Sequence, residues 1–410
     1  MTSTDLSAAT AATAPSGPSA KRVGVGALVV AGIALVGIAL GAWLLSSGRG
    51  DSAMLSWLIG AGLGVVFQRG RFCFMCIFRD VIVRRRVGGM LAVLTALAVG
   101  LVGYTLILDV WVPNPASGRL PPDAHVGPVS WVLALAGVAF GLGMSLSGGC
   151  ISGHLYRLGE GYARAPVALV GALIGFGLGF LTWRTAYVEV IWRAPAVWLP
   201  ATFGHAGALL LQLAALLALA GLLWWWSRDK LWPEQTGTLT PARLWRAVFG
   251  RRWPPLLSGG IVGALAVIAY FRVEPLGVTA QLGSLSRTAM DRAGWLSDRL
   301  PGLDTLAGCI TVVSQAVLDN GWLIMGLVLG SLAMALLSGR FRPSRLTVGN
   351  AGTALLGGVL MGWGAMLALG CTVGVLLSGI MAGALSGWVF FGSSFLGVFL
   401  GIRLGFDRSE

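Results

Sequence analysis

The chain has 410 residues, of which 56% are hydrophobic and only 11% are charged, and its formal net charge is +13. Many apolar runs reach the roughly 20 residues that span a bilayer, which excludes an ordinary soluble domain. A basic excess can also indicate nucleic-acid binding, but here the arginines gather in short connections between apolar runs, as in cytoplasmic loops of membrane proteins. The sequence therefore predicts an all-α polytopic membrane protein. The clusters are Arg79 with Arg84, Arg85 and Arg86, a group within 228–252, and Arg340, Arg342 and Arg345.

In chain order, residues 1–22 are rich in Ser, Thr, Ala, Gly and Pro and predict a disordered cytoplasmic tail. A first transmembrane half over 23–226 begins with an apolar run that fits a retained span better than a cleaved signal peptide. A cytoplasmic linker over 227–255 leads to a second half over 256–405 and a C-terminal tail over 406–410. Both termini are then expected in the cytoplasm, with the chain in the cell inner membrane.

About nine to eleven spans fit the apolar runs. Three of the runs, 53–78, 129–156 and 349–386, are interrupted by Gly and Cys, which predicts short re-entrant half-helices. The nearly charge-balanced segment 274–320 is expected to be a connection on the outer face. Within it, Leu276 aligns weakly with Cys73, which suggests a further break that has lost its thiol.

Two of the interruptions repeat one another. The stretch from Gly141 through Cys150 to Gly153 and the stretch from Gly362 through Cys371 to Gly374 share four glycines and the cysteine at a constant offset of 221 residues. This pattern predicts an internal two-fold repeat, and paired breaks in two halves indicate the binding site of a transporter.

The chain has five cysteines, and the odd count within apolar surroundings argues against a disulfide framework. Cys309 has no glycine frame and is expected to pack as a small hydrophobic residue. Cys73 and Cys76 have redox spacing without a thioredoxin-like context. With only three histidines, the chain offers little for a metal site, so no metal or cofactor is expected.

Buried thiols are neutral, weak S–H donors that can hold an anion, and half-helix N-termini add oriented N–H groups. Glycines let the backbone approach the ligand, and a polarizable thiol suits an oxyanion with soft sulfur better than phosphate or sulfate. The candidate binding residues are Cys73, Cys150 and Cys371 with Gly149, Gly153, Gly370 and Gly374. Possible accessory residues are Cys76, Arg71, Arg79, Arg157 and Glu160, and Arg69 can contribute to steering; topology anchoring explains these arginines equally well.

At these motifs the chain resembles the YeeE/YedE family of sulfur-compound transporters. The resemblance lies in Arg71-Phe-Cys73-Phe, in Gly149-Cys150-Ile-Ser-Gly153 followed by Tyr156-Arg157, and in Gly370-Cys371-Thr-Val-Gly374. It implies an hourglass-shaped protein whose re-entrant elements meet at a central constriction, where three cysteines pass thiosulfate. It also implies a cytoplasmic TusA-like sulfur carrier as a partner. Cys76 is an additional thiol beside the first motif.

We therefore expect a transporter of thiosulfate or a related sulfur anion and no enzymatic activity. Transport of a selenium compound and a membrane thiol redox or sulfur-transfer subunit remain alternatives. No nucleotide-binding loop accompanies the Gly-x-Gly runs, which lie inside apolar spans. A dianion that enters a negative-inside cell pays about 2.3 kcal/mol per charge per 100 mV, so inward flux needs coupling or consumption of the anion inside.

Overall fold

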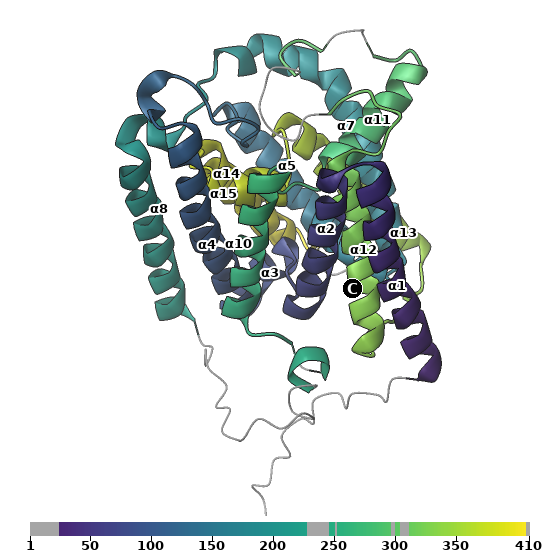
Figure 1. Cartoon of the computed structure of the whole chain (residues 1–410). Helices are drawn as coiled ribbons and strands as arrows, with labels where there is room; N and C mark the ends of the chain where they lie inside the picture. Colours follow the sequence, from purple (N-terminus) through teal and green to yellow (C-terminus); the bar gives the residue numbers. More distant parts are fainter. Residues whose placement is uncertain (1–23, 228–245, 251, 297–299, 304–310, 407–410) are drawn as a thin grey trace, which may run out of the picture.

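The computed structural model describes residues 24–227, 246–250, 252–296, 300–303 and 311–406. Within these ranges the chain is helical, and its β-structure is limited to two isolated bridges. Nine helical segments are long and apolar enough to cross a membrane, or ten if one bent pair counts as a span. Long helices stand side by side through the height of the molecule (Figure 1). The prediction of an all-α polytopic membrane protein is confirmed.

The first half contains α1 (Val25–Gly48), α2 (Asp51–Gly70), α3 (Phe74–Arg84), α4 (Gly88–Trp111), α5 (Trp131–Ser147), α6 (Ile151–Gly159), α7 (Arg164–Glu189) and α8 (Leu199–Trp226). The second half contains α10 (Pro255–Arg272), α11 (Ala280–Arg292), α12 (Asp319–Leu337), α13 (Val348–Leu367), a π-helical turn η4 (Thr372–Ser378), α14 (Gly379–Met381) and α15 (Leu385–Arg403). Two 3₁₀ turns, η1 (Pro115–Ser117) and η2 (Ile191–Arg193), and a second π-helical turn, η3 (Arg246–Gly250), complete the described elements. Helices dominate because lipid offers no hydrogen-bond partner to an open backbone.

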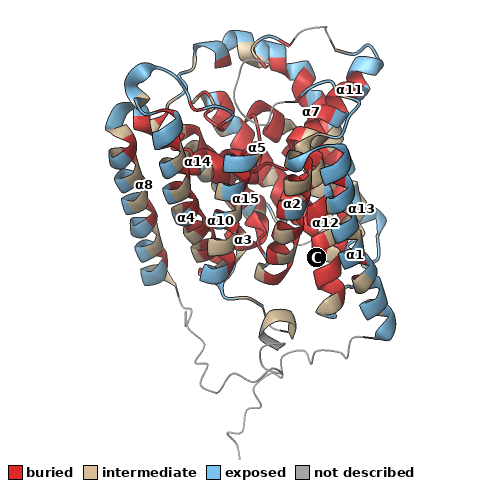
Figure 2. Cartoon of the chain, in the orientation of Figure 1, coloured by how far each residue is buried: buried red, intermediate tan, exposed pale blue. Residues whose placement is uncertain are grey.

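Burial separates the peripheral helices from the central ones. Only 17% of the most apolar window of α1 or α8 is buried, against 78% for the span that joins α2 and α3. Figure 2 shows the same contrast, with α8 and α1 largely exposed at the two sides and buried residues between them. Most exposed side chains of α1 and α8 are apolar, as a lipid-facing surface requires. The core therefore lies among the central helices.

Glycines bring the central helices into close contact. A Cβ on Gly60 would lie 2.1 Å from the carbonyl oxygen of Leu323, and one on Gly64 would lie 2.1 Å from that of Leu327, so α2 and α12 run parallel. On α5 and α13, Gly143 faces Gly357, whereas Gly364 faces Ala136, so these two helices run antiparallel. Such small-residue packing explains the repeated glycines at 143 and 364 without a ligand.

All three predicted interruptions are present. The chain leaves helical geometry between α2 and α3, between α5 and α6, and between α13 and η4, where the bend is 43°. Left-handed residues shape the breaks, at Arg71 (φ 52°), Gly148 (φ 80°) and Leu369 (φ 60°). The internal repeat and the hourglass shape stay predictions.

Between α10 and α12, the segment 274–320 contains the 13-residue helix α11, which packs against α7 and α12, and its place on the outer face stays a prediction. The preceding stretch from Val273 to Thr279 separates α10 from α11, so a break does occur near Leu276. Cys309 lies outside the described residues.

Candidate functional site

Each break places a cysteine at the start of the following short helix. Cys73 is the N-cap residue of α3, Cys150 that of α6, and Cys371 that of η4. All three side chains are fully buried. The N-cap position puts a thiol beside backbone N–H groups that have no partner within the helix.

The three thiols of the first half meet. The Cys73 side chain interacts with those of Cys150 and Cys76, so three sulfur atoms form a row. The Cys150 sulfur accepts the Gly153 N–H at 3.3 Å and lies 3.3 Å from the Ser152 hydroxyl. A Cβ on Gly153 would lie 2.7 Å from the Cys73 sulfur and 3.2 Å from the Cys150 sulfur. Gly153 therefore makes room for the thiol pair.

Cys371 has its partners in the second half. Its sulfur interacts with the backbone N–H groups of Val373, Gly374 and Val278 and with the Thr279 side chain. The break before α11 thus meets the break before η4, much as the break at Cys73 meets the break at Cys150. Thr279 supplies a hydroxyl group where the first half supplies a second thiol.

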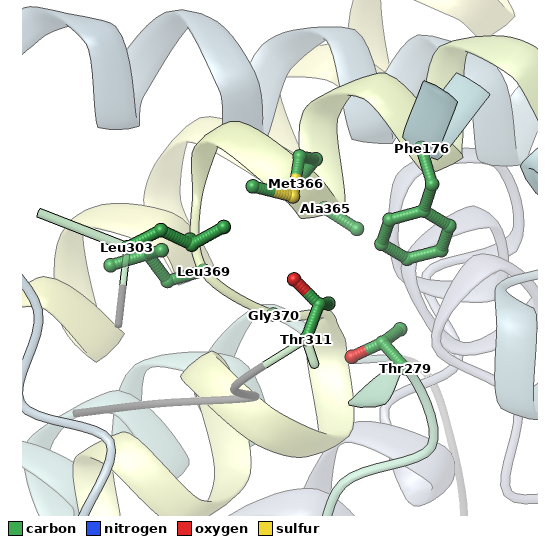
Figure 3. Close-up of a pocket in the computed structure, with 8 residues that line it drawn as sticks. All are labelled: Phe176, Thr279, Leu303, Thr311, Ala365, Met366, Leu369 and Gly370. Carbon is green, nitrogen blue, oxygen red and sulfur yellow. The ribbon is translucent and has the colours of Figure 1, made fainter. Parts of the chain in front are cut away.

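A small pocket adjoins Cys371 (Figure 3). It is bounded by the end of α13, by Phe176 of α7 and by the residue that precedes α11, and it is lined by Phe176, Thr279, Leu303, Thr311, Ala365, Met366, Leu369 and Gly370. Thr279 and Thr311 place hydroxyl groups among otherwise apolar side chains, and the Thr311 hydroxyl has no hydrogen-bond partner among the described residues. Its volume of about 10 Å³ has room for roughly one water molecule, so it is a small, partly polar space beside Cys371 and not a complete small-molecule site.

Arg157 connects Cys76 with the break before α6. One guanidinium nitrogen donates to the Cys76 sulfur at 2.9 Å, and another donates to the Gly148 carbonyl at 2.6 Å. The same guanidinium lies over the Tyr162 ring, 5.6 Å from its centroid. A positive charge therefore lies at the end of the row of sulfur atoms.

The other residues predicted for the site each have different surroundings. Glu160 accepts a hydrogen bond from Gln68 at 3.2 Å and lies within electrostatic range of Arg71 and Arg157. Gly149 precedes Cys150, and its absent Cβ would lie 3.2 Å from the His154 ring. Gly370 precedes Cys371 with a φ of 150°. Arg79 lies half-buried on α3, three residues or just under one turn beyond Cys76.

Sequence reasoning assigned no binding role to Thr279 or Thr311, because single threonines in a weakly apolar segment carry no motif. It also treated Arg69 as one of several basic residues, whereas the structure buries its side chain completely. The nearness of Arg69 to Cys73 in the sequence was the only available signal.

Long helices broken at buried cysteines define a polytopic membrane protein with thiols inside its bundle. The family model described as sulphur transport matches residues 69–400, and the chain belongs to this family, Sulf_transp. The chain is similar to the thiosulfate transporter TsuA of Escherichia coli K12, with 31% identity over 377 residues that cover 88% of this chain and 96% of the relative.

Other relatives agree. The thiosulfate transporter TsuA of Spirochaeta thermophila is 30% identical over 81% of this chain and 92% of its own length. The probable transporter YedE of Escherichia coli K12 is 28% identical over 54% of this chain and 52% of its own length. The resemblance to YeeE/YedE transporters that the motifs indicated is confirmed, and the chain is a sulfur-transport family protein of the membrane.

Proposed function

We propose that this chain carries thiosulfate, or a closely related sulfur-containing anion, into the cytoplasm along a path lined by Cys73, Cys150 and Cys371. Two relatives that align with most of this chain bear the name thiosulfate transporter, which supports the substrate class. The observation that carries the proposed path is the meeting of Cys73 and Cys150, far apart in sequence, at the starts of two half-helices.

The chemistry of these positions suits a sulfur oxyanion. Thiols donate weak hydrogen bonds without carrying a negative charge, so they do not repel a dianion. The N-terminal ends of α3 and α6 add positive dipole ends and free N–H groups. Gly153 leaves room for the Cys73 and Cys150 sulfur atoms, and the N–H groups of Gly153 and Gly374 face Cys150 and Cys371. Polarizable sulfur on the protein then faces polarizable sulfur on the anion.

The orientation follows from the arginines. The end of α3, the start of α10 and the end of α12 lie at one end of the bundle, which we call the arginine-rich end; it carries Arg69, Arg84, Arg252 and Arg340. By the positive-inside rule we assign this end to the cytoplasm and the pocket beside Cys371 to the outer side. The bilayer is then the inner membrane.

Energetics require a sink for an inward dianion. Entry against a negative-inside potential costs about 2.3 kcal/mol per charge per 100 mV. Rapid consumption of the anion by a cytoplasmic sulfur-accepting protein of the TusA-like kind would keep the inside concentration low. In this account the chain is a conduit that makes and breaks no covalent bond, and the acceptor performs the chemistry.

The test is growth of a sulfur auxotroph that expresses this chain, with thiosulfate or sulfite as the sole sulfur source. We expect rescue on thiosulfate by the wild type, loss of rescue with Cys150→Ala or Cys371→Ala, and retained rescue with the control Cys309→Ala. Membrane levels of every variant are compared by immunoblot. Rescue on sulfite alone, or full rescue by Cys150→Ala, would contradict the proposal.

A further inference from the structure

Arg69 is an unusual charge in this fold. Its side chain is fully buried at the end of α2, and its Nε, Nη1 and Nη2 atoms have no hydrogen-bond partner among the described residues. A topology-anchoring arginine places its guanidinium in water or among headgroups, so the positive-inside rule does not account for a buried one. Buried arginines are normally paired, because an unpartnered buried charge is strongly unfavourable.

The charges nearest to Arg69 increase this imbalance. Arg340 and Arg252 both act on it electrostatically, and both are positive. Arg71 acts in turn on Arg252 and Arg340. Desolvation, and after it the charges of Arg71 and Arg340, lowers the pKa of Arg252 to about 10. Four guanidinium groups therefore converge on one place.

The counter-charge is incomplete. Glu160 is the carboxylate that acts on Arg252 and Arg340, and it accepts a hydrogen bond from the Gln68 amide. Among the described residues this is one carboxylate against four guanidinium groups, and because Arg71 and Arg252 are exposed to solvent, it is the buried Arg69 whose charge is left without a counter-charge. A bound anion would balance it.

Further unpaired donors lie at the same place. A Cβ on Gly70 would lie 2.8 Å from the Ser258 hydroxyl oxygen, which is fully buried and has no partner among the described residues. Ser258 belongs to the first turn of the 18-residue helix α10, which has no side-chain cap. A long helix begins with free N–H groups and a positive dipole end, which together favour an anion.

We infer that Arg69 and Ser258, with Arg252 and Arg340 around them, form a second anion site at the arginine-rich end that binds a divalent oxyanion such as sulfate or thiosulfate. It is separate from the cysteine row, yet Arg71 and Arg157 link the two, because both act on Cys76. This inference rests on the proposed function only where it takes the second site as the last binding site before the anion enters the cytoplasm. The binding itself depends on the charges and unpaired donors.

The first experiment measures binding of inorganic sulfate to the purified full chain by calorimetry and by thermal unfolding at low ionic strength. We expect Arg69→Met and Ser258→Ala each to weaken sulfate binding by about tenfold or more. The control Arg403→Gln, which removes one exposed positive charge from α15, should bind like the wild type. Sulfate should raise the unfolding temperature of the wild type and leave that of Arg69→Met unchanged.

The unfolding temperature of Arg69→Met without sulfate tests whether Arg69 has an internal partner. Methionine has similar length and no charge, so without sulfate the variant should unfold at or above the wild-type temperature if Arg69 has no internal partner. An unchanged sulfate affinity in Arg69→Met and Ser258→Ala, or no sulfate binding by the wild type, would overturn the inference. So would an Arg69→Met that unfolds well below the wild type in the absence of sulfate.

Two further measurements show whether the second site is distinct from the transport path and which anion occupies it. Cys150→Ala should keep its sulfate affinity while it loses thiosulfate uptake, which shows that the sites are distinct. Reduced thiosulfate uptake by Arg69→Met identifies the transported anion as the occupant. If Arg69→Met takes up thiosulfate into vesicles at the normal rate, but sulfate placed inside the vesicles no longer changes that rate, the occupant is a cytosolic oxyanion instead. If Cys150→Ala also lost sulfate affinity, the claim of a second site would fail.

Discussion

Single residues set the space around the thiols, and Gly153 is the clearest case. Alanine favours helix over glycine by about 1 kcal/mol, yet a Cβ here would lie 2.7 Å from the Cys73 sulfur. We expect Gly153→Ala to lower thiosulfate uptake by about tenfold because the thiol pair must separate, which corresponds to about 1.4 kcal/mol. Uptake by whole cells, normalised to membrane protein, measures this effect.

The matched control for this substitution is Gly352→Ala in α13. No atom lies within 4 Å of the Cβ that it would add. It should keep full uptake and raise the free energy of unfolding by about 0.5–1 kcal/mol. Equal uptake by Gly153→Ala and the wild type would show that the space beside Cys73 is not used.

The site residues differed in how far the sequence revealed them. Cys150 and Cys371 were recognisable because their glycine frames repeat, and Cys73 because of its motif. The burial of Arg69 was hidden, since an arginine at the end of an apolar run looks the same whether it faces water or protein. The hydrogen bond of Arg157 to Cys76 depends on the approach of α6 to α3, which composition does not encode.

At the scale of elements, the spans and their breaks were predictable because bilayer-length apolar runs and glycine interruptions are visible directly. Helix α11 was not, because its sequence from Ala280 to Arg292 mixes Ser, Gln, Arg and Asp and looks like a surface connection. Its position next to α7 and α12 comes from tertiary packing. The parallel and antiparallel pairing of the glycine-rich helices likewise appears only in the fold.

The connection between α10 and α11 carries a titratable group outside the spanning helices. Burial, and after it the charges of Asp319 and Asp123, raises the pKa of Glu274 from 4.5 to about 7. The folded chain therefore holds a proton that the unfolded chain loses, so this contribution to stability is present below pH 4.5 and is lost as pH rises through about 7.

We expect the unfolding temperature of the wild type to fall across this pH window and that of Glu274→Gln to fall less. Thermal unfolding in a series of buffers of equal ionic strength measures the two slopes. Parallel slopes would mean that Glu274 is solvated like a surface carboxylate.

For the whole molecule, the proposed path joins buried thiols to a region of positive potential. In that path the pocket beside Cys371 lies on the outer side, the first-half thiols lie at the breaks of α2–α3 and α5–α6, and arginines surround the arginine-rich end. An anion is attracted by the arginines and held by neutral donors, so no step needs a buried carboxylate relay. The family membership and the named relatives support the passage of a sulfur-containing anion.

The central claim is that this chain alone passes thiosulfate by means of its buried thiols. The most direct measurement is uptake of radiolabelled thiosulfate into liposomes that contain only the purified chain, with an internal thiosulfate-consuming enzyme as sink. We predict uptake well above that of empty liposomes for the wild type, and uptake at the empty-liposome level for Cys73→Ala, Cys150→Ala and Cys371→Ala. Wild-type liposomes no faster than empty ones, or Cys150→Ala as fast as the wild type, would contradict the account.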